Sequence, residues 1–438
     1  MAGKKTQAQL TPEEKLQQAL VPEAEQPYKV PANWCWTRQN IACYLSDIEK
    51  IVNGEHPYLE AKFLRGLKKP KIVSAGKFIN KSSKVILVDG ENSGEVFDIF
   101  VDGYMGSTFR LLCFSEIVYE QYCRYFIIIN KEIYSKSKKG SAIPHLNKEL
   151  FFNMPFPLPP LTEQQRIVER IESLFAKLDE AKENLQNVLD GFETRKAAIL
   201  HKAFTGELTA NWRKQHGVSM ESWVITTLKD VCLKITDGTH NSPVNTPIGE
   251  YMYITAKNIK ETGVDLSNIT FVSKDVHNEI YSRCDVQYGD VLYIKDGATT
   301  GIATVNNIEI PFSLLSSVAV LRPNKKIILA KYMAYNLNSS EVKSMMINNM
   351  SGNAITRLTL TKIKAAIIKI CSLEEQAEIV RIIDDLLVKE QQAKKLAENA
   401  LAKIDLIKKS ILARAFRGKL GTNNLADEPA VELLKQML

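Results

Sequence analysis

The sequence predicts an α+β protein: two strand-rich mixed α/β domains separated by two long antiparallel helices that form a coiled coil, related by a pseudo-twofold internal repeat. Two observations support this fold class. The phrase AFTGEL at 203–208 returns as AFRGKL at 415–420, and apolar residues recur at helical spacing before each copy. A chain of 438 residues with 45% apolar composition can bury more than one core, so we expect two or three domains.

The repeat extends well beyond the six-residue phrase. Shifting the chain by 212 positions aligns 161–211 with 373–423 without a gap, and the same offset relates GSAIPHL (140–146) to GNAITRL (352–358). The matched positions include phenylalanine, glycine and asparagine at fixed places, which compositional bias does not produce. Each repeat unit therefore consists of a variable block followed by a helical block.

The helical blocks carry apolar residues at alternating spacings of four and three, which is the a/d seam of a coiled coil. The predicted seam residues are Ile167, Ile171, Leu174, Leu178, Leu185, Val188, Phe192, Ile379, Ile383, Leu386, Ile404, Ile407 and Ile411. Large seam residues of the first block correspond to alanines of the second, and facing layers of large and small side chains pack densely. We therefore expect the two helices to pair, antiparallel if one variable block lies at each end. The sequence alone leaves a parallel pair open.

Both helices carry start and stop signals. Residue pairs with the spacing of a capping box stand at the two starts: Thr162 with Gln165, and Ser372 with Glu375. Inside the repeated phrase, Gly206 and Gly418 suit the left-handed backbone position that ends a helix. The phrase is thus predicted to be a helix stop, present twice because the helix is present twice.

The variable blocks, 30–155 and 221–370, read as strand-rich mixed domains. Corresponding apolar strands at 83–94 and 289–301 each end in Asp-Gly with a second glycine four residues later. We interpret these as turns between strands, because a phosphate-binding loop would need a lysine after the second glycine. Each block opens on a tryptophan phrase predicted to be its first strand, and YFIII (125–129) is predicted to be a buried strand.

Composition excludes several classes of protein. No apolar run is long enough to span a bilayer, and the first residues lack the apolar segment of a signal peptide. Seven cysteines without a C-x-x-C pair indicate reduced thiols and a cytoplasmic location, and six histidines without ligand spacing argue against a metal site. The net charge of +7 resides in the variable blocks, which fits polyanion binding. The pattern favours a protein for recognition and scaffolding.

The two helix openings, PLPPLTEQQRIVERI and SLEEQAEIVRII, each followed by A-F-x-G-x-L, and the tail LADEPAVELLKQML (425–438) resemble the specificity (S) subunit of type I restriction–modification systems over roughly residues 28–438. The resemblance implies a non-catalytic protein that binds double-stranded DNA with two target-recognition domains, each reading one half of a bipartite, gapped site. It implies helices that set the spacing and dock two methyltransferase (M) subunits, joined by restriction/translocase (R) subunits. S-adenosylmethionine, ATP and Mg would then belong to those partners, and this chain would hold no cofactor.

With this resemblance, the predicted domains are 1–29, an N-terminal extension; 30–159, target-recognition domain 1; 160–217, the central helical spacer; 218–371, target-recognition domain 2; 372–417, the C-terminal helical spacer; and 418–438, a tail. The extension is acidic and amphipathic and departs from the family pattern. We expect it to close a pseudo-circular arrangement against the C-terminal tail.

Phosphate contacts come from Lys, Arg and polar groups, whereas base edges are read by Arg, Asn, Gln, Ser, Thr and Lys. In the first block the candidate DNA-binding residues are Arg65, Lys68, Lys69, Lys71, Lys77, Lys81, Lys84, Lys136, Lys138 and Lys139. In the second block they are Thr239, His240, Asn241, Lys257, Asn258, Lys295, Ser351, Asn353 and Arg357.

Two other functions compete with DNA recognition. The modest charge and the lack of a helix-turn-helix also fit a coiled-coil adaptor whose two domains bind proteins. The phrase NMPF (153–156) resembles the motif of amino-methyltransferases, but Met occupies its second position and no glycine-rich cofactor loop precedes it. A salt titration separates DNA binding from protein binding, because phosphate contacts weaken with salt.

Overall fold

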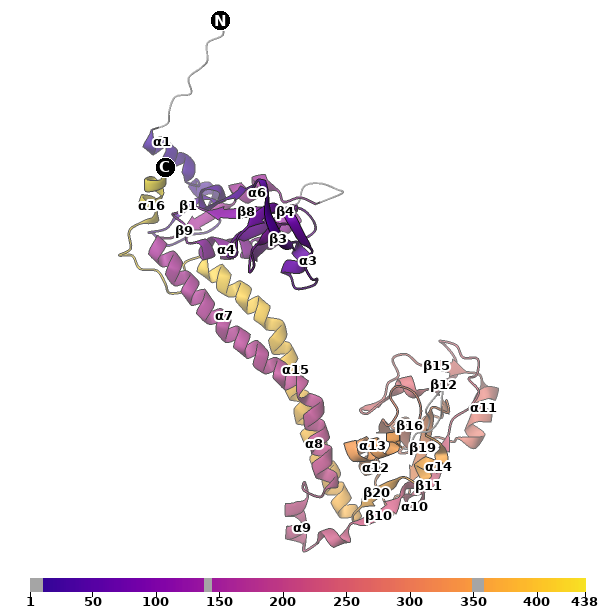
Figure 1. Cartoon of the computed structure of the whole chain (residues 1–438). Coiled ribbons are helices and arrows are strands. Elements are labelled where there is room, and N and C mark those ends of the chain that lie inside the picture. The colour runs from indigo at the N-terminus through magenta and orange to yellow at the C-terminus, as the bar shows by residue number, and fades with distance from the viewer. Residues whose placement is uncertain (1–10, 138–143, 349–357) are drawn as a thin grey trace. The chain divides into compact units, whose positions relative to one another are not determined.

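The computed structural model of the chain describes residues 11–137, 144–348 and 358–438 (Figure 1). The chain divides into two compact units. The first unit combines Met1–Leu185 with Asn399–Leu438, and the second unit is Gln186–Glu398.

The first unit contains two small sheets, a two-stranded ribbon and the helices around them. Its strands are β1 (Cys35–Arg38), β2 (Cys43–Ser46), β3 (Lys50–Leu59), β4 (Ile72–Ile79), β5 (Lys84–Leu87), β6 (Val96–Asp98), β7 (Gly103–Met105), β8 (Phe109–Phe114) and β9 (Pro155–Leu158). Its shorter helices are α1 (Pro12–Ala19), α2 (Gln39–Ala42), α3 (Ala61–Leu64), α4 (Glu120–Ile129), α5 (Lys131–Lys136), α6 (Lys148–Asn153) and α16 (Ala430–Met437).

The second unit repeats this plan. Its strands are β10 (Val224–Thr227), β11 (Cys232–Asp237), β12 (Tyr251–Ile254), β13 (Ile259–Lys260), β14 (Gly263–Val264), β15 (Thr270–Val272), β16 (Val291–Ile294), β17 (Ala303–Val305), β18 (Ser313–Leu314), β19 (Val318–Pro323) and β20 (Ile367–Ile370). Its shorter helices are α9 (Ala210–His216), α10 (Leu228–Val231), α11 (Lys274–Arg283), α12 (Ala330–Asn338), α13 (Ser340–Asn348) and α14 (Leu360–Lys364).

The strand orders of the two units correspond. The first unit has the four-stranded order β2-β8-β5-β6 and the second has β11-β19-β16-β17, all antiparallel. Beside it, β3 pairs parallel with β7 and antiparallel with β4, as β12 pairs parallel with β18 and antiparallel with β15. The internal repeat therefore covers the variable blocks as well as the helices, although their sequences show little of it.

Three long helices follow the domains: α7 (Leu161–Asp190), α8 (Phe192–Phe204) and α15 (Leu373–Ala415). Within the first unit, Ile167 and Ile171 at the start of α7 share one buried cluster with Leu412 and Ala415 at the end of α15. Within the second unit, the end of α8 packs against the start of α15 in the same sense. The helices are therefore antiparallel, which confirms the predicted fold class.

Most of the predicted seam is buried or half-buried, and two positions are wrong. Val188 is exposed and Leu189 is half-buried in its place, since a straight helix drifts from a seven-residue repeat and the chain turns at Gly191 between α7 and α8. Ile407 is 44% exposed. There the seam passes to Lys408, whose ammonium lies 5.0 Å from the Phe175 ring centroid.

The helix signals are confirmed at the stops and only partly at the starts. Gly206 and Gly418 have φ of 84° and 66°, and both follow the last turn of a long helix. The Ser372 hydroxyl accepts a hydrogen bond from the Glu375 N–H at 3.3 Å, but the Glu375 side chain points into the core. Because α7 begins at Leu161, Thr162 lies inside the first turn and is not its N-cap.

The turn predictions are confirmed, whereas the buried strand at 125–129 is wrong. Each Asp-Gly loop is a turn between antiparallel strands, with φ of 103° at Gly90 and 97° at Gly297. Residues 125–129 form the second half of α4, where Tyr125, Phe126 and Ile127 are buried. A short apolar run does not distinguish a strand from a helix, and the helical spacing begins earlier, with Tyr122.

The N-terminal extension meets the C-terminal tail, as expected. Ala19 of α1 belongs to the same buried cluster as Ala430 and Leu434 of α16. The Lys15 ammonium donates a hydrogen bond to the Leu438 carbonyl at 3.0 Å. Figure 1 shows the two short helices side by side.

Candidate nucleic-acid interface

The two variable blocks are attached to the helices by a repeated glutamine. The Gln164 amide donates to the carbonyls of Ile117 and Pro159, at 3.1 and 3.0 Å, and its oxygen accepts from the Tyr119 N–H at 2.7 Å. Gln376 repeats all three hydrogen bonds, with the carbonyls of Ile327 and Cys371 and the N–H of Leu329, each at 2.9 Å. Both side chains are fully buried, so each domain is held rigidly on its helix.

A buried carboxylate precedes each glutamine. Glu163 accepts hydrogen bonds from the Trp34 indole at 2.8 Å, the Asn423 amide at 2.8 Å and the Thr422 hydroxyl at 3.4 Å. Each carboxylate joins three segments: the first strand of the domain, the start of one long helix and the segment after the other. The repeated tryptophan phrases anchor the domains through this contact.

Glu375 occupies the same place in the second unit. It accepts hydrogen bonds from the Trp223 indole at 3.1 Å and the Thr209 hydroxyl at 2.7 Å. It also forms an ion pair with the buried Arg213 guanidinium at 2.6 Å. Both domains are thus anchored on their helices by buried polar contacts, which fix the surface loops that each domain presents.

In the first unit, the exposed loop between α3 and β4 brings together the predicted basic residues Arg65, Lys68, Lys69 and Lys71. Lys68 pairs with Glu60 at 2.9 Å, and this hydrogen bond lowers the pKa of the Glu60 carboxyl. Arg65 pairs with Glu95, while Lys69 and Lys71 make no ion pair with another described residue. Their ammonium groups are therefore available to a polyanion.

This loop borders an open hollow of about 680 Å³ that is partly apolar. Phe63 and Phe100 form its floor, with ring centroids 5.5 Å apart, and Leu67 is exposed at its rim. We call the hollow and residues 65–71 the basic hollow. Apolar side chains beside lysines suit contact with a sugar–base edge next to phosphates.

The other basic candidates of the first unit are dispersed. Lys77 pairs with Asp47 and lowers the pKa of that carboxyl, and Lys84 pairs with Glu120 and, at 3.6 Å, with Asp98. Lys81 and Lys136 are exposed on other segments. Lys138 and Lys139 lie outside the described residues.

In the second unit, the loop after β11 is held by its own side chains and by β18. The Thr239 hydroxyl donates to the Asn241 carbonyl at 3.0 Å, and the Thr239 N–H donates to the Leu314 carbonyl at 2.8 Å. Gly238 permits this approach, because a Cβ there would lie 2.0 Å from the Leu314 carbonyl oxygen. Thr239, His240 and Asn241 are thus presented at one edge of the domain.

A lysine, an arginine and a histidine surround the buried carboxylate of Asp237 at the base of this loop. The Lys295 ammonium lies 3.4 Å away, and the Arg283 guanidinium and the His240 imidazole each lie 3.5 Å away. We call Asp237, His240, Arg283 and Lys295 the Asp237 cluster. Lys295 is buried, so it holds the loop, whereas His240 and Arg283 face outward.

Asn258 is a buried structural residue. Its amide donates to the carbonyls of Asp265 and Asn268, and its oxygen accepts from the Thr255 N–H at 3.1 Å. Its side chain is therefore used within the fold, while its neighbour Lys257 is exposed. Ser351, Asn353 and Arg357 lie outside the described residues.

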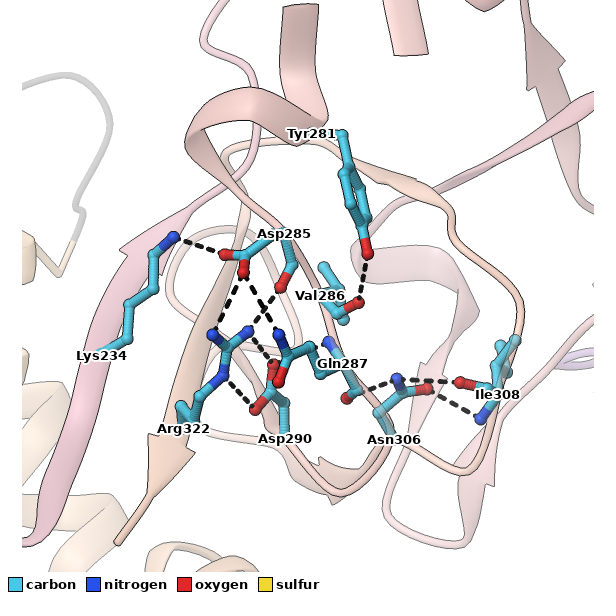
Figure 2. Close-up of polar contacts among 9 residues, drawn as sticks. All are labelled: Lys234, Tyr281, Asp285, Val286, Gln287, Asp290, Asn306, Ile308 and Arg322. Carbon is cyan, nitrogen blue, oxygen red and sulfur yellow. Dashed lines mark hydrogen bonds and ion pairs between the residues drawn. The ribbon is translucent and has the colours of Figure 1, made fainter. Parts of the chain in front are cut away.

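A polar network fixes the segment that follows α11 and so positions Arg283. Figure 2 shows Arg322 of β19 reaching both carboxylates of this segment, at 3.0 Å to Asp290 and 3.2 Å to Asp285. Lys234 of β11 also bonds Asp285, and the Asn306 amide donates to the Gln287 carbonyl at 2.9 Å. The network thus holds the residues that directly follow Arg283, the member of the Asp237 cluster at the end of α11.

Sequence reasoning missed Arg283 and the apolar rim of the basic hollow. Arg283 ends a short helix whose sequence carries no motif, and it meets Asp237 only through the fold. Leu67 lies within the predicted basic loop, but an exposed leucine has no sequence signal that separates it from a buried one. The exposed loop that follows Asn241 carries two more such residues, Val244 and Ile248.

The described ranges contain neither a metal-binding cluster nor a membrane-spanning helix. No group of three or more His, Cys, Asp or Glu side chains there could hold a metal ion. No helix there combines the length and apolar character needed to cross a bilayer.

Residues 39–190 and 220–399, more than half of the chain, match the family model for the type I restriction modification DNA specificity domain. The chain is 28% identical to the specificity subunit of the type I restriction enzyme EcoBI from Escherichia coli, over 66% of this chain and 63% of that protein. It is 24% identical to the MjaVIII specificity subunit from Methanocaldococcus jannaschii, over 86% of this chain and 89% of that protein. The match thus spans somewhat under two-thirds of the E. coli relatives.

Solved structures share the fold. An HsdS subunit from Thermoanaerobacter tengcongensis is similar with a TM-score of 0.60 and 19% identity, over 90% of this chain and all of that one. A chain from a structural study of the assembly and conformational transition of a type I R-M system gives a TM-score of 0.63 and 20% identity, with the same coverage.

Proposed function

The chain belongs to the type I restriction modification DNA specificity family, and on this premise we propose that it is the non-catalytic DNA-specificity subunit of such a system. Each unit reads one half of a bipartite, gapped site in double-stranded DNA. The observation that carries the proposal is the duplication itself. Two units share strand order and anchoring residues but present different polar surfaces, the basic hollow in one and the Asp237 cluster in the other. A duplicated scaffold with two different surfaces suits two different half-sites.

The helices set the spacing between half-sites and dock two methyltransferase subunits, and restriction/translocase subunits complete the enzyme. The names of the relatives support a place in a multi-subunit restriction enzyme, since each is called a specificity subunit of one. The partner subunits bind S-adenosylmethionine, ATP and Mg, and the assembled enzyme acts in the cytoplasm. In this arrangement the chain supplies recognition and geometry while its partners supply the chemistry.

Phosphate binding is tested at the basic hollow. Replacing Lys68, Lys69 and Lys71 by Gln should weaken binding to every DNA sequence and reduce the slope of log affinity against log salt by up to about three, since each phosphate contact contributes about 0.9. Three exposed helix lysines, Lys182, Lys395 and Lys403, replaced together by Gln, remove the same charge and should change the slope much less. An unaltered slope in the first variant contradicts the assignment.

Base reading is tested at the Asp237 cluster. Arg283→Ala should relax one position of one half-site, at about 1–3 kcal/mol for the lost contact, and leave the other half-site unchanged. The readout is the set of adenines methylated in a random DNA library by the complete methyltransferase complex. Arg381→Ala, an exposed arginine on α15, is the control and should leave both half-sites unchanged.

The spacing role is tested by inserting one heptad into each long helix. The rise is about 10 Å per heptad along the helix and about 3.4 Å per base pair along DNA, so the gap should lengthen by no more than about three base pairs. The half-site sequences should stay the same. A changed half-site with an unchanged gap would refute the spacing role.

A further inference from the structure

The two units contain one corresponding ribbon each, and among the described residues a further segment covers only the first of the two. Strand β1 pairs with β9 and β10 pairs with β20 in the same antiparallel register: Trp36 lies opposite Pro157, as Ile225 lies opposite Lys369. Each ribbon joins the entry of its domain to its exit. The outer edge of the first strand is therefore comparable between the units, position by position.

In the first unit the N-terminal extension covers this edge. The Val21 N–H donates to the Trp36 carbonyl at 2.9 Å, and Leu20 forms an antiparallel bridge with Thr37. The Thr37 hydroxyl donates to the Ala19 carbonyl at 2.9 Å. The extension thus adds a short third strand to the ribbon, and Trp36 is 3% exposed.

Tyr28 of the same extension completes the cover. Its ring centroid lies 4.9 Å from that of Trp36 in an edge-on contact, and the Arg417 guanidinium lies 5.1 Å from its ring. Burial raises the pKa of the Tyr28 phenol to about 12. The aromatic ring is therefore inserted between the ribbon and Arg417, which stands two residues after the end of α15.

In the second unit the corresponding place is open. Ile225 is 68% exposed, and its neighbours Val224 and Ile367 are exposed as well. Beside them lies a predominantly apolar cavity of about 310 Å³, lined among others by Phe204, Thr205, Ile225, Met345, Ile367 and Ile368. Thr205 stands where Arg417 stands in the repeat, so the cavity is the counterpart of the place that Tyr28 fills. No residue in the described part of the second unit fills it.

The chain path explains the difference. In the first unit, the tail after the end of α15 contains α16, and the extension before Trp34 contains α1. The two segments meet beside the first ribbon. In the second unit, a short linker connects Phe204 to Trp223 and carries only α9 and one 3-10 turn, Met220–Ser222. No part of this fully described linker pairs with β10. The second ribbon consequently keeps a free strand edge, an apolar face and a cavity of aromatic size, a combination that proteins usually cover.

We propose that the β10 edge and this cavity dock an extended segment of a partner polypeptide, which adds a strand to β10 and inserts an aromatic side chain into the cavity. Strand addition supplies main-chain hydrogen bonds and the pocket supplies the side-chain preference. The docked segment should resemble residues 19–28 in its chemistry. It should place a small residue and an aliphatic residue along the β10 edge, followed by an aromatic side chain in the cavity. The inference does not depend on DNA binding.

The structure favours a partner over a second copy of this chain. The extension of each copy is engaged on its own β1, and its removal would expose Trp36 and the cluster that contains Ala19. The surroundings of the cavity also disfavour nucleic acid. Its lining is predominantly apolar and includes one lysine, Lys369, and one carboxylate, Glu341, which is paired with His201, so the cavity offers no cluster of positive charge.

The test uses the full-length chain and a labelled peptide of residues 11–30, the segment that covers the first ribbon. The peptide carries a photoreactive phenylalanine analogue at the position of Tyr28. We expect saturable binding and cross-links to peptides containing Ile225, Met345 or Ile367. Ile225→Glu should weaken binding at least ten-fold without changing the melting temperature, because this side chain is exposed. A peptide with Ala in place of Tyr28 should bind at least ten-fold more weakly.

Val244→Glu is the matched control, because Val244 is an exposed apolar residue of another loop in the same unit, and binding should be unchanged. Cross-links confined to Trp36 would show exchange within the first unit and overturn the proposal. A dimer of the chain that Ile225→Glu dissociates would assign the face to a second copy. Displacement of the peptide by double-stranded DNA would assign the face to nucleic acid. Absence of saturable binding also overturns the proposal.

Discussion

The two units place a carboxylate at the same point and satisfy it differently. Glu163 receives its hydrogen bonds from neutral donors, the Trp34 indole, the Asn423 amide and the Thr422 hydroxyl. Glu375 faces a buried guanidinium as well as an indole and a hydroxyl. The repeat therefore keeps the acceptor and the tryptophan, while the segment after the opposite helix supplies whichever donors it has. The two units therefore share the geometry of the anchor, but the contribution of the anchor to stability differs between them.

The largest expected effect comes from removing the charged anchor. Glu375→Ala leaves the Arg213 guanidinium buried and unpaired, which should lower the stability of the second unit by about 3–5 kcal/mol. Urea unfolding followed by near-ultraviolet circular dichroism measures it. Glu374→Ala, on the neighbouring exposed residue, should have little effect. Arg213→Met added to Glu375→Ala should restore part of the loss, and no restoration would show that the charge is not the cause.

A second effect is expected at alkaline pH, from Tyr28 in the first unit. The Tyr28 pKa is about 12 in the folded protein and about 10 when unfolded, so folding favours the protonated phenol. The contribution is complete below pH 10 and is lost as pH rises through 12, by up to about 2–3 kcal/mol. Thermal melting of the wild type and of Tyr28→Phe at pH 9 and 11.5 tests this. An equal loss in both proteins contradicts it.

The Glu163 anchor, whose donors are neutral, should contribute less to the free energy of unfolding than the Glu375 anchor, which includes an ion pair. Glu163→Ala leaves an indole and an amide without their acceptor but strands no charge, and we expect a loss of about 2 kcal/mol in the first unit. The same urea experiment applies, with the exposed Glu169→Ala as control. If Glu163→Ala destabilises as much as Glu375→Ala, the guanidinium contributes nothing to the difference between the units.

The smallest effect on stability is expected at the uncovered β10–β20 ribbon. Ile225→Ala should change the stability of the isolated chain by less than about 0.5 kcal/mol, as for an exposed side chain. Trp36→Ala, its counterpart under the extension, should cost about 3–5 kcal/mol. The two variants, compared by thermal unfolding, distinguish a covered face from an open one. A large effect of Ile225→Ala would mean that the second face is covered within the chain itself.

Sequence patterns predicted the features that depend on local order. The repeat, the antiparallel helices, the glycine stops and most seam residues follow from periodicity and backbone conformation. The prediction for Ile407 was wrong because the seam drifts along a straight helix. Lys295 is buried because it pairs with Asp237 on a distant strand, and Asn258 is buried because its amide bonds carbonyls of the loop that follows it. The cavity beside Ile225 could not be predicted, since it exists only by comparison with the place that Tyr28 fills.

The ribbons also have a genetic consequence. Because β1 lies against β9 and β10 against β20, the first and last strands of each domain lie side by side, as in an inserted domain with adjacent ends. Recombination between two such genes near codons 34 and 159, or 223 and 371, would exchange a whole domain and leave the helices unaltered. The junction is a four-residue ribbon whose backbone pairing does not depend on the side chains. A cassette with such ends can supply a new surface in one event, provided that the tryptophan at its entry is retained.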